Sequence, residues 1–150
     1  LMGEFMQKGG ERYSLQDVLH PGSGAGMMGD GDSVEAMAAF ALTLRNMLFM
    51  DFESRLDVLP SPREEWFIPG SEMVVQDAPS RFGPISFRVL SSSGDVQFRF
   101  TDLPKFVPPE IMINLPFRAK IKQESDFVIK KDFGNAVTIN GWPEIVKFSR

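Results

Sequence analysis

Apolar and polar residues alternate strictly through much of the chain after residue 55, and this pattern restricts the possible folds more than any other. Ile85, Phe87 and Val89, for example, alternate with Ser86 and Arg88. Successive side chains of a β-strand point to opposite faces of a sheet, so a period of two is typical of strands with one buried and one solvated face. The alternation therefore predicts antiparallel sheet.

Short runs of this kind recur up to residue 148, separated by proline, glycine and serine. We predict strands at 56–59, 73–76, 85–90, 96–101, 111–115, 119–122, 127–130, 137–139 and 145–148. Residues 91–95 form a predicted hairpin loop, and Asn140-Gly141 a second tight turn. About nine short strands with regular turn signals indicate a sandwich. The predicted fold class is mainly β: an antiparallel β-sandwich preceded by one long buried helix and a glycine-rich loop.

Residues 33–50 have a helical period instead. Asp32 is placed to cap this helix, Glu35 follows three residues later, and the alanines favour helix intrinsically. Apolar residues cover nearly every face, namely Val34, Met37, Ala41, Leu44 and Leu48 on one side and Phe40, Leu42, Met47 and Phe49 over most of the rest. A helix that is apolar all round is normally buried. A chain of this length offers little to bury it against, so we expect a missing domain or a partner.

The glycine-rich residues before the helix resist ordering into a regular element. We divide the chain at residue 52. Residues 1–52 are the glycine-rich loop and terminal helix, the remnant of a helical domain, and residues 53–150 are the β-sandwich. The given sequence begins Leu1-Met2-Gly3, which does not look like the start of a complete natural protein. We therefore expect a fragment of a longer protein, or an engineered product.

Composition excludes several function classes. The 150 residues contain no cysteine and one histidine, His20, which excludes disulfides, thiol nucleophiles and multi-histidine metal sites. The formal net charge of −4 argues against nucleic acid as a partner. Residues 1–75 hold five Lys and Arg against twelve Asp and Glu, whereas residues 76–150 hold eleven against eight. We see no apolar run long enough to span a bilayer and no signal-peptide pattern, so we expect a soluble protein without a membrane partner, in an unknown compartment.

Residues 24–29 satisfy the G-x-G-x-x-G pattern of dinucleotide-binding loops. No strand-like segment precedes them, and Asp30 and Asp32 place carboxylates where a phosphate would lie. We therefore expect no cofactor. The sequence does not match a calcium-binding EF-hand loop either, because Val34 and Ala41 occupy positions where that loop needs oxygen ligands. We expect no bound metal. Two roles remain possible for Asp30 and Asp32: stabilising the start of the helix, or contacting a substrate.

Three other side chains are candidate ligand contacts. His20 precedes a proline next to the glycine-rich loop, where a lone histidine more often hydrogen-bonds locally. Trp66 and Trp142 could stack on sugar rings, although Trp66 also suits the sealing of a domain edge. Residues Lys120, Lys122, Lys130 and Lys131 lack interleaved aromatics, so we interpret them as a solvated face.

A series of short motifs extends from about residue 22 to residue 89. In chain order they read MGDGD at 28–32, TLRNML at 43–48, LDVLP at 56–60, REEW at 63–66 and APSRFGPISF at 78–87. This order resembles the C-terminal end of bacterial glycoside hydrolases with an (α/α)6-barrel catalytic domain, in which the last barrel helix leads into a β-sandwich. Ser33, Val34 and Glu35 depart from the family pattern, which has aromatic and histidine residues after the Gly-Asp-Gly step.

The resemblance implies that the helix is the last helix of a barrel. The glycine-rich loop would lie near the barrel mouth, where a glycan binds. Arg81, Phe82 and Gly83 would be structural, with Gly83 permitting a bend into the next strand and Arg81 pairing with an acidic group such as Asp77. The usual pair of catalytic carboxylates cannot both be placed in this segment, so no catalytic residue is assigned.

Three functions follow from this reasoning. The first is a non-catalytic accessory domain that packs against the catalytic barrel of a glycoside-hydrolase-like protein. The second is a carbohydrate-binding module that uses Trp66 or Trp142 as a platform. The third is a stand-alone interaction protein that dimerises through its helix. The parent protein is expected to be a glycosidase, and the chain alone is not expected to be an enzyme.

Overall fold

The structure is a computed structural model that describes residues 20, 22–23, 33–122 and 127–149. The chain divides into two compact units, Leu1–Arg45 and Asn46–Arg150. The predicted domain boundary at residue 52 refers to a longer protein and stays a prediction. In the described part of the chain, no helix has both the length and the apolar character needed to cross a membrane.

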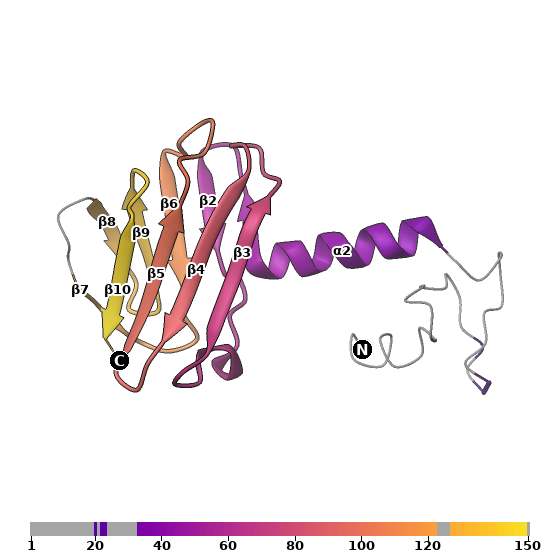
Figure 1. Cartoon of the computed structure of the whole chain (residues 1–150), viewed down its shortest axis with the longest axis horizontal. Helices are drawn as coiled ribbons and strands as arrows, with labels where there is room; N and C mark the ends of the chain where they lie inside the picture. The colour runs from indigo at the N-terminus through magenta and orange to yellow at the C-terminus, as the bar shows by residue number, and fades with distance from the viewer. Residues whose placement is uncertain (1–19, 21, 24–32, 123–126, 150) are drawn as a thin grey trace. The chain divides into compact units, whose positions relative to one another are not determined.

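Helix α2 spans Val34–Leu48 (Figure 1). It begins after Ser33, whose Oγ accepts a hydrogen bond from the backbone N–H of Ala36 at 3.1 Å. Ser33 thus holds the N-cap position that we predicted for Asp32, and a serine hydroxyl satisfies this otherwise unpaired N–H well. The helix ends at Leu48, two residues earlier than predicted.

None of the residues of α2 is buried. The exposed fraction is 72% for Val34, 54% for Leu42 and 42% for Leu44. The burial that we expected for this helix is therefore not supplied by the residues that the structure describes.

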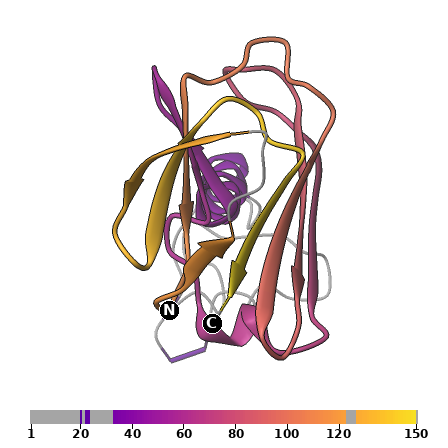
Figure 2. The ribbon, with the colours of Figure 1, turned by 90° about the vertical axis from the view of Figure 1, so that its left-hand side faces the viewer.

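In the residues that the structure describes, ten strands form two five-stranded sheets, which lie face to face (Figures 1 and 2). The first sheet has the order β1-β2-β6-β9-β8, with bounds Phe49–Asp51, Arg55–Val58, Glu110–Asn114, Ala136–Asn140 and Val128–Asp132. The second has the order β3-β4-β5-β10-β7, with bounds Glu72–Ala78, Ile85–Ser91, Asp95–Thr101, Ile145–Ser149 and Lys120–Lys122. A 3-10 helix, η1, spans Glu64–Phe67. The predicted mainly-β sandwich is confirmed, and each of the nine predicted strands is present.

The structure corrects two details of this prediction. Phe49 and Met50, predicted as helical, begin β1, because this segment pairs antiparallel with β2. β2 and β6 pair in parallel, so the sandwich is not purely antiparallel. The Asn140-Gly141 turn, with Gly141 at φ 81°, joins strands of different sheets. The loop between β4 and β5 is a hairpin connection, as predicted.

Phenylalanine fills the space between the sheets. Phe87, Phe98 and Phe100 are at most 3% exposed, which confirms their predicted place inside the sandwich. The rings of Phe98 and Phe148 meet edge to face at 5.7 Å, an arrangement that aromatic quadrupoles favour. Phe49 is buried as well, but from strand β1 instead of the predicted helix.

Candidate functional site

The glycine-rich loop lies outside the described residues, and with it Asp30, Asp32 and the G-x-G-x-x-G pattern. His20 is described and exposed. Its Nδ1 accepts hydrogen bonds from the backbone N–H groups of Gly22 and Ser23, at 3.2 Å and 3.1 Å. His20 therefore stabilises a local turn, in agreement with the alternative that a lone histidine hydrogen-bonds locally.

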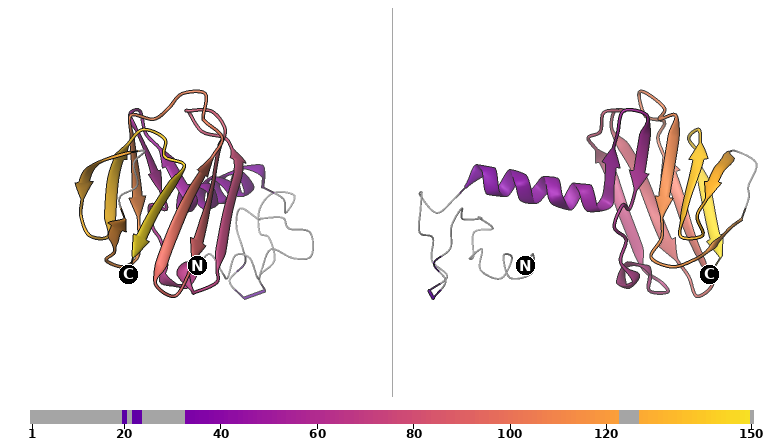
Figure 3. Two further views of the ribbon diagram at one scale, coloured as in Figure 1. Left: turned by 60° about the vertical axis from the view of Figure 1, so that its left-hand side comes forward. Right: turned by 180° about the vertical axis from the view of Figure 1, so that it is seen from behind.

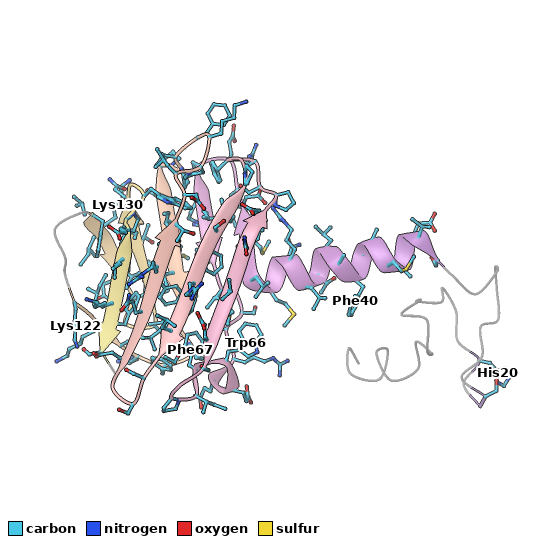
Figure 4. The ribbon with its side chains drawn as sticks, viewed as in Figure 1. His20, Phe40, Trp66, Phe67, Lys122 and Lys130 are labelled. Carbon is cyan, nitrogen blue, oxygen red and sulfur yellow. The ribbon has the colours of Figure 1, made fainter. Side chains whose placement is uncertain are left out.

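Trp66 lies on η1, next to the buried Phe67 (Figure 4). The Trp66 side chain is half-buried and packs against the hydrophobic core. Phe67 contacts Phe117 edge to face at 5.6 Å. Beside this pair lies an open cleft of about 360 Å³, lined by Glu64, Phe67, Ile68, Pro69, Phe117 and Arg118. Trp66 itself does not line the cleft.

Trp142 follows the turn between β9 and β10 and is half-buried. Its ring meets Phe100 at 5.1 Å. The Trp142 Nε1 atom and the Asn140 Oδ1 atom are both buried without a hydrogen-bond partner in the structure. A buried donor and a buried acceptor two residues apart are costly unless water or a ligand satisfies them.

Phe82 and Gly83 are held in a tight turn before β4. Phe82 is 5% exposed, and its carbonyl accepts the N–H of Phe106 at 2.9 Å. Gly83 has φ 104°, a conformation that side chains rarely adopt. The backbone N–H of Arg81 donates to Asp51 Oδ2 at 2.6 Å. Among the described residues, no ion pair joins the Arg81 guanidinium to Asp77, the partner we had suggested.

The outer face of the second sheet carries an ordered set of charges. Its strands alternate between buried residues, such as Val96, Phe98 and Phe148, and side chains that point away from the core. The outward cations are Arg88, Arg99, Lys120, Lys122 and Lys147, and the anions are Glu72, Asp95 and the exposed Asp77 at the bulge of β3. We call these five cations the basic face. Figure 1 shows this sheet in front.

Two cross-strand pairs on the basic face have like charge. Arg88 lies directly opposite Arg99 in the β4–β5 register, and Lys147 lies directly opposite Lys122 in the β10–β7 register. Like charges in such positions are destabilising, because their Cβ atoms are only about 5 Å apart.

Each like-charge pair includes one cation that is paired with a carboxylate. Glu72 pairs with Arg88 at 2.6 Å, and Asp95 pairs with Lys122 at 2.7 Å. Within the described residues, no ion pair involves Arg99 or Lys120. The anions therefore offset only part of the positive charge on this face.

An open hollow of about 430 Å³ lies at one end of the basic face. Lys122 and Lys147 line it, together with Asp95, Gln97 and Ser92. Leu90, Gln97, Lys147 and Lys122 are successive cross-strand neighbours, so they form one continuous row over four strands. The row offers ammonium and amide donors to a ligand that lies across the sheet.

The structure divides the lysine cluster that we had interpreted as one solvated face. Lys120 and Lys122 belong to β7 of the second sheet, whereas Lys130 and Lys131 belong to β8 of the first (Figure 4). Sequence reasoning missed Arg88, Arg99 and Lys147 as members of one surface. The hairpin prediction could have placed Arg88 near Arg99, but the pairing of β10 with β7 is long-range and has no local signal.

Titratable groups form no metal-binding cluster in the described residues. No group of three or more His, Asp or Glu side chains gathers there in a way that could hold a metal ion. The hydrogen bond from Lys130 Nζ to Glu110 Oε1, at 2.7 Å, lowers the pKa of that carboxyl. Glu110 is an exposed surface partner of Lys130, so this shift reflects a surface ion pair.

Comparison with known proteins gives no significant match to any family model, curated protein or solved structure.

Proposed function

We propose that this chain is a non-catalytic accessory domain that packs against the helical catalytic barrel of a glycoside-hydrolase-like protein. The observation that carries the proposal is helix α2, which is apolar on nearly all faces and has no buried residue. Fully burying a leucine side chain contributes roughly 1.5–3 kcal/mol. Val34, Leu42 and Leu44 therefore represent a large stabilisation that a helical neighbour would supply.

The connection between helix and sandwich supports the same proposal. α2 ends at Leu48 and β1 begins at Phe49, with no linker between them. The Leu48 side chain packs against the sandwich core, and its carbonyl accepts the N–H of Leu59 at 2.8 Å. A direct connection of this kind suits a domain that has a defined place beside its neighbour, because a flexible linker would let the two separate.

The first test is the coding sequence upstream of Leu1, where we expect a long series of helical repeats. In the longer protein, Leu42→Glu should lower the unfolding temperature, because it would bury a carboxylate between helices. Val74→Glu is the matched control, since Val74 is 51% exposed on edge strand β3 and Leu42 is 54% exposed. Absence of upstream helices, or equal effects of the two substitutions, would overturn the proposal.

The isolated chain should show no hydrolysis of any oligosaccharide in a panel of substrates. Activity of the purified chain would contradict a purely accessory role. Light scattering addresses the alternative that the helix forms a dimer, because the exposed Leu42 and Leu44 side chains could also be covered by a second copy. A monomer at all concentrations argues against the dimer.

Carbohydrate binding is a second candidate, favoured by the half-buried Trp142 ring beside the turn between β9 and β10. Titration with glycans should then change tryptophan fluorescence. Trp142→Phe keeps an aromatic ring and removes the donor, and Trp66→Phe serves as the control. A response that persists in Trp142→Phe would exclude this site.

A further inference from the structure

We infer that the basic face of the second sheet binds an acidic polysaccharide, with the negative groups of the polymer lying over Arg99, Lys122 and Lys147. Five outward cations against three anions, Asp77 included, make this face positive, although the whole chain has a formal net charge of −4. A positive region on an acidic protein concentrates polyanions locally.

The like-charge pairs are the main argument for a ligand. Arg88 opposite Arg99, and Lys147 opposite Lys122, cost stability in the free protein. A bound carboxylate or sulfate between two such side chains removes the repulsion and adds charge-assisted hydrogen bonds. The side chains are accessible for this, since those of Arg88 and Lys122 are 51% and 49% exposed.

The chemistry of the face favours a glycan over a nucleic acid. Single-stranded nucleic acids bind proteins through aromatic side chains on which the bases stack. The outward residues paired along β4, β5, β10 and β7 include no aromatic, and the apolar ones are Leu90 and Ile145. Gln97, Ser92 and Asp95 in the hollow suit hydroxyl groups, which sugars carry. The choice of a glycan also rests on the proposed function.

The arrangement of side chains in a row across the sheet suits an extended polymer. The row Leu90, Gln97, Lys147 and Lys122 runs across four neighbouring strands. Strands lie about 4.8 Å apart, so the row spans roughly 14 Å, the length of a few sugar residues. A polymer with repeated carboxylates can therefore contact several cations of the face at once.

Affinity electrophoresis of the full chain tests the inference. The probes are polygalacturonate, dextran sulfate, neutral dextran and single-stranded poly-dT. We expect retardation by one or both acidic polysaccharides and none by neutral dextran. Raising the salt from about 50 mM to about 200 mM should weaken the binding strongly, because counterions compete for the anionic groups. No retardation by either acidic polysaccharide at the lower salt, or stronger retardation by poly-dT, would overturn the inference.

A matched pair of double variants locates the site. Arg99→Gln with Lys147→Gln should weaken binding about tenfold, the effect expected when two charge-assisted contacts are lost. Arg118→Gln with Lys131→Gln removes the same net charge elsewhere and should bind as the unaltered chain does. Equal weakening in both would show that net charge alone attracts the polymer. Unfolding midpoints confirm that each variant is folded.

This experiment is separate from the test of the accessory role. Failure to bind acidic polysaccharides would leave the packing of α2 against a helical barrel untouched, since that depends on Leu42. Conversely, absence of upstream helical repeats would remove the accessory role, while binding by the isolated chain would still be measured directly.

Discussion

At the scale of single residues, the turn before β4 depends on the absence of a side chain. Gly83 has φ 104°, and a Cβ atom there would lie 3.0 Å from Lys105 Cβ and 3.1 Å from the Lys105 backbone nitrogen. Real Cβ atoms are rarely this close to backbone. The nearby hydrogen bond from Phe106 N–H to Phe82 O ties the same two loops together. Backbone conformation and close packing therefore both require glycine.

Gly83→Ala should accordingly lower the free energy of unfolding by about 1–3 kcal/mol. Gly94→Ala is the control, since a Cβ atom at Gly94 would meet nothing within 4 Å. Its effect should stay within about 0.5 kcal/mol. Chemical denaturation measures both. Equal effects would mean that the turn adapts to a side chain.

The surface pair Lys130–Glu110 gives a prediction about pH. The hydrogen bond from Lys130 holds the pKa of the Glu110 carboxyl below its ordinary value. A carboxyl whose pKa is lower in the folded state stabilises the fold above its unfolded pKa, and this contribution is lost as the pH falls through the folded pKa. Lys130→Gln should therefore raise the pKa of Glu110 and reduce the loss of stability on acidification.

NMR titration of the Glu110 carboxyl measures this shift. Lys131→Gln is the comparison, because Lys131 acts on Glu110 only through its charge and should have a smaller effect. A larger effect from Lys131→Gln would show that charge outweighs the hydrogen bond.

At the scale of elements, the β4–β5 hairpin is where local pattern and tertiary structure agree best. Alternation predicts both strands, and serine and glycine between them predict the loop. Phe98, on β5, packs edge to face against Phe148 of β10 and is fully buried. In contrast, Phe49 and Met50 continue the apolar pattern of the helix, and only pairing with β2 makes them a strand.

Phe98→Ala should lower the free energy of unfolding by about 3–5 kcal/mol, because it leaves a cavity between the sheets. Val74→Ala, on the exposed edge strand β3, should cost less than about 1 kcal/mol. Urea denaturation followed by circular dichroism compares the two. A similar cost at both positions would mean that the core relaxes around the missing ring.

At the scale of the whole molecule, the sandwich has its own core. The buried residues form one hydrophobic cluster from Phe49 to Phe148, to which both sheets contribute. Figure 3 shows the sandwich from two further directions, with the first sheet in front in the right-hand view. A unit with its own core can fold alone.

Residues Asn46–Arg150 should therefore fold without the preceding unit. We expect the thermal midpoint of this truncated chain to lie within about 4 °C of the midpoint of the full chain, which corresponds to less than about 1 kcal/mol. Differential scanning calorimetry measures both. A much lower midpoint, or loss of the cooperative transition, would show that the first unit stabilises the sandwich.

The sequence pattern predicts the fold class, the nine strands and the helical segment, because the periodicity of apolar residues and the positions of turn-forming residues are local properties of a chain. Tertiary structure decided the parallel pairing of β2 with β6 and the tenth strand at Phe49. It also decided which cations share a surface. Lys147 and Lys122 lie side by side because β10 pairs with β7, and such long-range pairing depends on the packing of the whole sandwich.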